Sequence, residues 1–169
     1  MIQQQKLILK VLQGEKHLPP PIWLMRQAGR HLPEYLKLRS QAENFLNFCY
    51  SPRLCVEATL QPIRRYNLDA AILFSDILVI PDALGQQVNF ISGTGPVLNP
   101  ISTVKEIDEL NLKLSYEKLS PIYESIEQIT EKLKNFDVNP ALIGFAGAPW
   151  TVATYMVEGG SSKDYQKTR

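Results

Sequence analysis

Two short apolar runs, each followed by small and polar residues, most constrain the fold of this chain. Residues 70–74 are Ala-Ala-Ile-Leu-Phe and lead into Ser75 and Asp76. Residues 141–145 are Ala-Leu-Ile-Gly-Phe and lead into a Gly-Ala-Pro-Trp loop. An unbroken apolar run of this length is typical of a parallel β-strand covered on both faces. Between the runs, residues 121–136 carry apolar side chains at helical spacing, so the order predicts an α/β fold with a parallel sheet.

The remaining pattern predicts further helices, one hairpin and a possible third strand. Pro62 should kink its helix or restart it, because proline lacks the N–H that an interior helical hydrogen bond needs. We expect helices at residues 2–13, 33–39 and 151–157, and another that begins at Pro52 with Ser51 as its cap. A capping box at Thr103 and Glu106 indicates one more helix start. We also expect a hairpin at residues 86–98 and a strand at residues 22–25. Two firm strands are few for 169 residues, which indicates only part of an α/β domain.

Composition excludes several classes of protein. The net charge is +1 and 44% of residues are apolar, as in a globular chain. Basic side chains outnumber acidic ones before residue 65, which suits an anionic small molecule as well as a nucleic acid, but they form no basic run. No apolar stretch reaches the roughly 18 residues of a membrane span. The two cysteines and two histidines match no metal or redox spacing. We therefore expect a cytoplasmic protein with reduced cysteines, no metal, no nucleic-acid partner and no membrane segment.

Two arginines four residues apart, Arg26 and Arg30, flank Gln27, Ala28 and Gly29. A guanidinium stays charged near neutral pH and binds a carboxylate through two parallel hydrogen bonds. Two such groups on one tight turn suit a ligand with several carboxylates. A surface loop with two solvated arginines is the alternative interpretation.

Asp76 and Tyr155 are the other candidates for a site. Asp76 ends a buried strand, where α/β folds place ligands and chemistry, although a carboxylate there can also cap the next helix. Tyr155 falls in the helix that follows the Gly-Ala-Pro-Trp loop, where a tyrosine is more often a core residue than a ligand contact.

The motifs around these residues resemble the uroporphyrinogen decarboxylase family. The resemblance runs in order from about residue 19 to the end of the chain. Its motifs are Pro-Ile-Trp-Leu-Met-Arg-Gln-Ala-Gly-Arg at 21–30, Leu-Pro-Glu-Tyr at 32–35, Leu-Gln-Pro-Ile-Arg-Arg at 60–65, Asp-Ala-Ala-Ile-Leu-Phe-Ser-Asp-Ile-Leu at 69–78, Pro-Asp-Ala-Leu-Gly at 81–85, Gly-Phe-Ala-Gly-Ala-Pro-Trp-Thr at 144–151 and Thr-Tyr-Met-Val-Glu-Gly-Gly at 154–160. Corrinoid methyltransferases share that family's barrel but lack the paired-arginine motif.

The resemblance implies a cytosolic (β/α)₈ TIM-barrel carboxy-lyase, a homodimer without metal or organic cofactor. Such an enzyme converts uroporphyrinogen III to coproporphyrinogen III in porphyrin and heme biosynthesis by removing CO₂ from four acetate side chains. It implies that Arg26 and Arg30 bind substrate carboxylates and that Gln27, Ala28 and Gly29 line the same turn. Asp76 would face the pyrrole N–H groups as the catalytic residue, and Tyr155 would be a further substrate contact.

The length of the chain departs from the family. A complete barrel takes about 250 residues, so residues 1–169 form the N-terminal portion of a single barrel domain, an incomplete barrel. A truncated record, a decayed copy and one piece of a split enzyme all fit this length. The alternative function is a non-catalytic fragment that binds tetrapyrrole or a partner chain. A methyltransferase is a weaker alternative, because it would need metal ligands on later strands.

Overall fold

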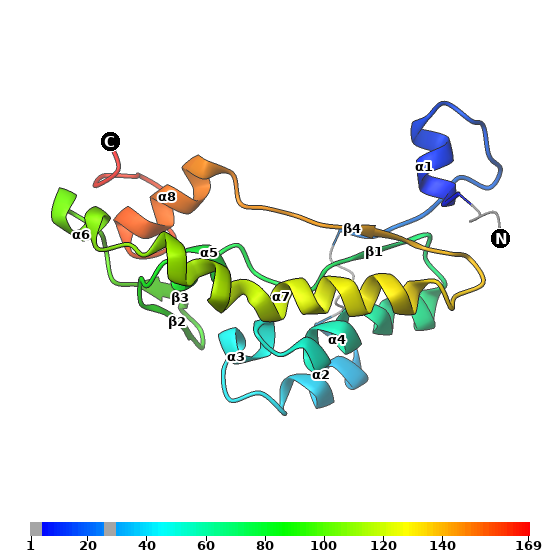
Figure 1. Cartoon of the computed structure of the whole chain (residues 1–169), viewed down its shortest axis with the longest axis horizontal. Coiled ribbons are helices and arrows are strands. Elements are labelled where there is room, and N and C mark those ends of the chain that lie inside the picture. Colours follow the sequence, from blue (N-terminus) through cyan, green and yellow to red (C-terminus); the bar gives the residue numbers. More distant parts are fainter. Residues whose placement is uncertain (1–4, 26–29) are drawn as a thin grey trace.

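The computed structural model describes residues 5–25 and 30–169, and at residue 114 the backbone alone. It is a mixed α/β structure in which helices predominate (Figure 1). The described elements are α1 (Leu7–Leu12), α2 (Pro33–Arg39), α3 (Phe45–Cys49), α4 (Pro52–Tyr66), β1 (Ala70–Ile72), α5 (Val79–Ala83), β2 (Val88–Ile91), β3 (Gly95–Leu98), α6 (Val104–Asp108), α7 (Leu112–Leu133), β4 (Ala141–Ile143) and α8 (Pro149–Glu158).

The two apolar runs pair as parallel strands, which confirms the central prediction. In the register of β1 and β4, Ala70 lies opposite Ala141 and Ile72 opposite Ile143. Helices α4 and α7 lie on one face of this two-stranded sheet (Figure 1). The expectation of burial on both faces holds at Ala70, Ala71 and Ala141 but is wrong for the last residues of each strand, which are half-buried.

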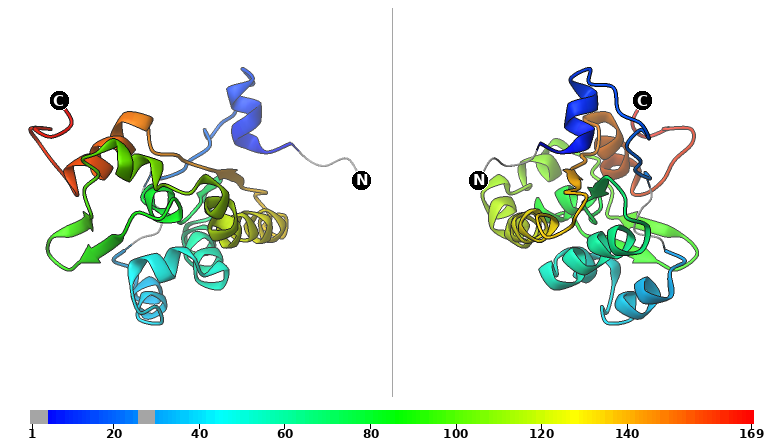
Figure 2. Two further views of the ribbon diagram at one scale, coloured as in Figure 1. Left: turned by 60° about the vertical axis from the view of Figure 1, so that its left-hand side comes forward. Right: turned by 90° about the vertical axis from the view of Figure 1, so that its right-hand side faces the viewer.

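The predicted hairpin is confirmed as β2 paired with β3 in antiparallel register. Gly93 lies in its turn and Gly95 is the first residue of β3, and both are in the left-handed region, with φ of 80° and 93°. A residue with a Cβ is strained at such φ values, so glycine is suited to this turn. In Figure 2 the hairpin projects away from the helices.

Two helices contain a proline without interruption, and here the predicted boundaries are wrong. The expected start at Pro121 lies in the middle of α7, and α4 continues through Pro62, so Pro62 does not restart it. Proline removes one backbone hydrogen bond from a helix interior. Helices α4 and α7 pack against each other and bury a shared apolar face, and tertiary burial of this kind outweighs one missing bond.

Most other helix boundaries agree with the sequence. Helix α2 begins at Pro33, and Thr103 and Glu106 form the predicted capping box at the start of α6. Ser51 occupies the cap position of α4, but its side chain makes no capping hydrogen bond. Helix α8 ends at Gly159, where φ is 81° and an added Cβ would lie 2.7 Å from Cγ of Pro100.

The N-terminal segment differs more from the expectation. Helix α1 covers only part of the predicted 2–13 segment, of which residues 2–4 lie outside the described range. Residues 22–25 form no strand. The Ile22 backbone instead accepts a hydrogen bond from the Asp69 N–H, at 2.9 Å. The Ile22 N–H donates to the Asp69 carboxylate at 2.7 Å. The Asp69 side chain therefore accepts the hydrogen bond from the Ile22 N–H that a neighbouring strand would otherwise accept.

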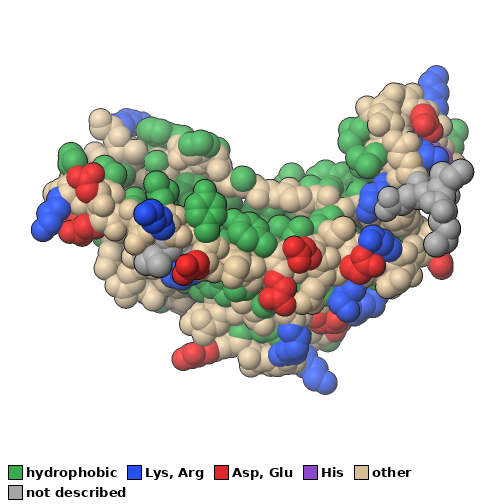
Figure 3. Space-filling view, viewed as in Figure 1, with side chains coloured by type: hydrophobic (Ala, Val, Ile, Leu, Met, Phe, Trp, Pro, Cys, Tyr) green, Lys and Arg blue, Asp and Glu red, His purple; other side chains and the backbone are tan. Residues whose placement is uncertain are grey.

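The main core fills the space between α2, α3, α4, α7 and the two strands. Cys55 lies on the buried face of α4, and both cysteines are free thiols, as expected. The other side of the molecule is open: Figure 3 shows a hollow between the ends that carry α1 and α8, with hydrophobic side chains gathered along it.

Candidate functional site

Asp76 lies just beyond the carboxyl end of β1, in the turn that leads into α5. Its side chain is half-buried, and its Oδ1 accepts a hydrogen bond from the Leu78 N–H at 2.9 Å. Leu78 is the residue before the first turn of α5. The carboxylate is therefore held by the backbone of its own turn, with Oδ1 occupied by that bond.

Opposing effects act on the ionisation of Asp76. Burial raises the pKa of this carboxyl above its ordinary value, because a charged group loses hydration there. The Leu78 N–H and the positive charge of Arg30 act in the other direction and lower the pKa, but burial is the largest cause. The site thus holds a carboxylate that is poorly hydrated and pre-oriented, which strengthens its interaction with any nearby positive charge.

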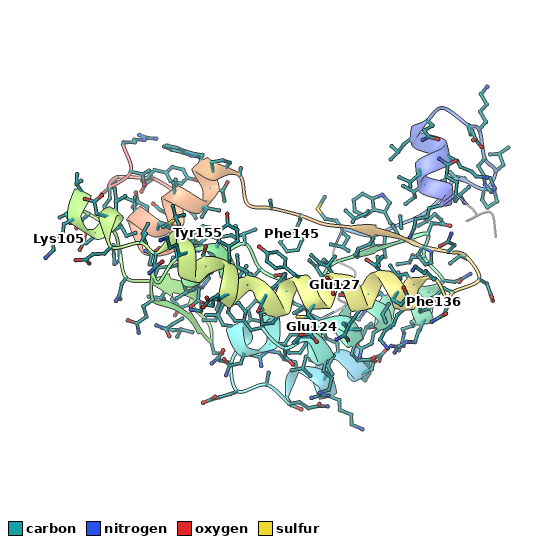
Figure 4. The ribbon with its side chains drawn as sticks, in the orientation of Figure 1. Lys105, Glu124, Glu127, Phe136, Phe145 and Tyr155 are labelled. Carbon is teal, nitrogen blue, oxygen red and sulfur yellow. The ribbon has the colours of Figure 1, made fainter. Side chains whose placement is uncertain are left out.

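A cavity of about 460 Å³ opens beside Asp76. The carboxyl ends of both strands reach it, β1 through Leu73 and Asp76 and β4 through Phe145 and Gly147. Helices α7 and α8 supply further apolar lining. Among the described residues that line it, Asp76 is the one carboxylic acid. Phe145 points from the segment between β4 and α8 toward α7 (Figure 4). An apolar cavity with few polar groups is typical of a small-molecule site.

Gly147 allows the loop after β4 to approach the turn after β1. A Cβ built at Gly147 would lie 2.5 Å from Cγ2 of Val152 and 3.1 Å from Cβ of Ile77. The first distance is too short for any side chain to be added without movement. The two loops therefore meet next to Asp76 because residue 147 has no side chain.

Arg30 approaches the same region from the segment before α2. Its charge acts on Asp76, and its guanidinium carbon lies 5.9 Å from the centre of the Phe45 ring. Arg30 is an exposed residue, and its guanidinium can bind an anionic ligand. The other predicted residues of the paired-arginine motif, Arg26, Gln27, Ala28 and Gly29, lie outside the described residues.

Tyr155 is placed differently from the expectation that it faces one cavity with Asp76. It packs against the small core formed by Leu78, Val88 and Leu98, and it is not among the described residues that line the Asp76 cavity. Its neighbour Met156 lines that cavity instead. Tyr155 thus contacts the core that contains Leu78, whose N–H holds Asp76, and Figure 4 labels it on α8.

Sequence reasoning missed a second cluster near Asp76, in which Tyr50 and Lys118 both contact Asp82. Asp82 belongs to one of the family-like motifs, but neither Tyr50 nor Lys118 follows any local pattern. Only the packing of α3 and α7 on either side of α5 brings them together. Nothing in the sequence alone predicts this cluster.

Within residues 5–25 and 30–169, no group of three or more His, Cys, Asp or Glu side chains is arranged to hold a metal ion. Over the same described ranges, no helix combines the length and apolar character needed to cross a bilayer.

Comparison with known proteins gives a consistent result. Residues 3–169 match the family described as Uroporphyrinogen decarboxylase (URO-D). The uroporphyrinogen decarboxylase of Rhodospirillum rubrum is 55% identical over 95% of this chain and 45% of its own length. That of Maricaulis maris is 53% identical over 98% of this chain and 47% of its own. The chain therefore spans about half the length of the curated relatives it matches.

A solved structure shares the fold at much lower sequence identity. It is a methyltransferase from Methanosarcina mazei, 21% identical, with a TM-score of 0.64 over 89% of this chain and 44% of the other. This likeness concerns the fold alone. The family match covers nearly the whole sequence, and this chain belongs to the uroporphyrinogen decarboxylase family.

Proposed function

We propose that this chain is the N-terminal half of a (β/α)₈ barrel enzyme that decarboxylates the four acetate side chains of uroporphyrinogen III to give coproporphyrinogen III. One observation carries the proposal: the Asp76 carboxylate is poorly hydrated, is held by a backbone N–H and lies at the carboxyl end of a parallel strand. This carboxylate occurs in a chain that is 55% identical to a uroporphyrinogen decarboxylase. Barrel enzymes place their chemistry at this end of the strands.

The chemistry of the reaction explains the need for such a carboxylate. Loss of CO₂ from an acetate leaves an electron pair on carbon, which is costly unless an electron sink is attached. A pyrrole ring protonated on carbon serves as that sink, so the substrate supplies what a cofactor would supply elsewhere, and we propose that the enzyme uses none. The protonated ring is cationic. Asp76, fixed near the ring N–H groups, stabilises this charge as it develops.

Arginines then position the carboxylates of the substrate. Arg30 is exposed and lies within electrostatic range of Asp76, which supports its role in binding an acetate or propionate group. Arg26 and the intervening turn of Gln27, Ala28 and Gly29 are proposed to act with it. Tyr155 is proposed as a further contact, and its packing on the Leu78 core supports at least an indirect role.

The state of the whole enzyme is part of the same proposal. The parallel pairing of β1 and β4, with α4 and α7 on one face, supports an incomplete barrel that the rest of the protein would close. We propose a cytoplasmic homodimer as the active form.

The test is a chimera in which this chain is joined in frame to the C-terminal remainder of the Rhodospirillum rubrum relative. Chemically reduced uroporphyrinogen is supplied, and coproporphyrinogen is measured after oxidation to the porphyrin. The chimera should form product, and its Asp76→Asn variant should lose on the order of 10²-fold in kcat, with a smaller change in KM.

The control is Arg64→Met, which removes an exposed ion pair on α4 away from the cavity and should leave kcat unchanged. A chimera that melts cooperatively and yields no product contradicts the proposed function. Product formation that is unaffected by Asp76→Asn removes Asp76 from the mechanism.

A further inference from the structure

The position of Asp76 depends on a very short helix. Its carboxylate is held by the Leu78 N–H, and Leu78 is the cap residue of α5. Helix α5 has five residues, Val79–Ala83. A helix of this length is not stable by itself, because the cost of its first turn is not recovered by the few bonds that follow. Neighbouring elements must therefore hold α5, and with it the donor to Asp76.

Apolar contacts hold one side of α5. Val79, Pro81 and Ala83 are buried. Burial of this kind attracts the helix to the core, but it is non-directional and sets the rotation of a short helix only loosely. Directional contacts are needed to fix the helix more closely.

Such contacts converge on Asp82, in the last turn of α5. The Tyr50 hydroxyl at the end of α3 lies 2.8 Å from Oδ2 of Asp82 and 3.2 Å from the Val79 carbonyl oxygen. From α7, the Lys118 ammonium lies 2.7 Å from the same Oδ2 and donates to the Asp82 carbonyl oxygen at 2.8 Å. The Asp82 side chain is only 13% exposed. The Lys118 side chain is 46% exposed, so water screens the ion pair on that side, whereas the Asp82 carboxylate is shielded and has a second donor on the same oxygen.

Lys118 and Tyr50 also contact each other. The Lys118 ammonium lies 5.9 Å from the centre of the Tyr50 ring, within the range of a cation–π interaction. The three side chains thus form a closed set that joins α3, α5 and α7. We call Tyr50, Asp82 and Lys118 the α5 clamp.

We propose that the α5 clamp is a positioning device for Asp76: by fixing α5, it holds the Leu78 N–H where it binds and orients the Asp76 carboxylate. The importance of this for decarboxylation rests on the proposed function. The positioning itself is a property of the described chain and can be measured without turnover.

The surroundings of Asp76 make the positioning measurable. The Leu78 N–H lowers the pKa of Asp76 against the effect of burial, so movement of α5 away from Asp76 should raise that pKa. The charged or titratable groups that interact with Asp76 from other elements are Arg30, before α2, and the Cys49 thiol of α3. Neither Asp82 nor Lys118 is among the causes of the shift at Asp76.

Two variants separate positioning from a direct electrostatic effect. Tyr50→Phe removes a neutral hydroxyl, so a direct effect predicts no change in the pKa of Asp76. Asp82→Ala removes a negative charge, so a direct effect predicts no change or a lower pKa. The α5 clamp predicts a higher pKa in both variants, together with faster hydrogen exchange at the Leu78 amide.

The measurement is a ¹³C-carboxyl NMR titration of the 169-residue chain, with the Asp76 resonance assigned by its loss in Asp76→Asn. Arg64→Met is the matched control, since it breaks an ion pair on α4 that does not involve α5, and it should leave the pKa and the Leu78 amide unchanged. If Asp82→Ala fails to fold, Tyr50→Phe decides the question alone. An Asp76 pKa unchanged or lowered in a folded Tyr50→Phe variant overturns the proposal.

An activity measurement in the chimera separates this proposal from the proposed function. Tyr50→Phe should lower kcat more than it raises KM, and Lys118→Arg, which keeps the ion pair, should retain more activity than Lys118→Met. A shifted Asp76 pKa in a chimera that makes no product supports the clamp and contradicts the function. An active chimera in which Tyr50→Phe leaves the pKa of Asp76 unshifted supports the proposed function and contradicts the clamp.

Discussion

The ionised carboxyl group of Asp76 lowers the stability of the folded chain, and other contacts in the fold compensate for this loss. Burial raises its pKa, so in the folded chain it is harder to ionise than in the unfolded chain. Such a group contributes stability below its unfolded pKa, about 3.8, and loses that contribution as pH rises through the higher folded value. A buried charge that destabilises its own fold is common at sites where it performs chemistry.

The sign of this linkage gives a prediction for Asp76→Asn, which stays neutral at every pH and can still accept from the Leu78 N–H. Its melting temperature should equal that of the parent at about pH 2, where the carboxyl group is protonated in both the folded and the unfolded chain, and should exceed it at about pH 7. Thermal melts followed by circular dichroism between these values check this. A variant that melts well below the parent at about pH 7 would instead assign the carboxylate a structural capping role.

At the scale of the elements, the sequence predicted those turns and helix starts that depend on neighbouring residues in the chain. Gly93 and Gly95 set the hairpin turn, and Thr103 with Glu106 set the start of α6, because each depends only on near neighbours. The sequence did not predict the true start of α7 or the continuity of α4 through Pro62, because packing between the two helices decides both.

The same limit applies to the candidate site. Asp76 could be found because the end of a buried strand is visible in the sequence. The α5 clamp could not be found, since Tyr50 and Lys118 come from helices that meet α5 only after folding. Tyr155 was predicted to face the Asp76 cavity, whereas the rotation of α8 directs Met156 there instead.

Packing between α4 and α7 should account for much of the stability of the chain. Ile129 of α7 is fully buried, whereas Ile126 on the same helix is 36% exposed. Ile129→Ala should lower the free energy of unfolding by about 2–5 kcal/mol, because it removes apolar contacts and leaves a cavity.

Ile126→Ala is the matched control and should cost about 1 kcal/mol or less. Urea unfolding of both variants, followed by fluorescence, gives the comparison. Equal losses at the two positions would show that the helix pair contributes less than its burial indicates.

At the scale of the whole molecule, the chain should be inactive when alone. It spans about half of the length of its curated relatives, and Phe145, which lines the cavity beside Asp76, is 44% exposed. Purified chain supplied with reduced uroporphyrinogen should bind it weakly and release no CO₂ above the blank. Turnover of roughly 1 per second or more, typical of an ordinary enzyme, would show that copies of the chain assemble a complete site.

The pairing of β1 with β4 also has a consequence for the order of events during synthesis. Ala70 of β1 pairs with Ala141 of β4, which is synthesised 71 positions later in the chain. At roughly 5–20 residues per second, the interval is about 4 to 14 seconds. Throughout it, α4 can cover β1, but the β4 strand that pairs with it has not yet been made. The edge of β1 that receives β4 in the folded chain thus waits for seconds during synthesis, which makes this interval the stage at which a holding chaperone would be of most use.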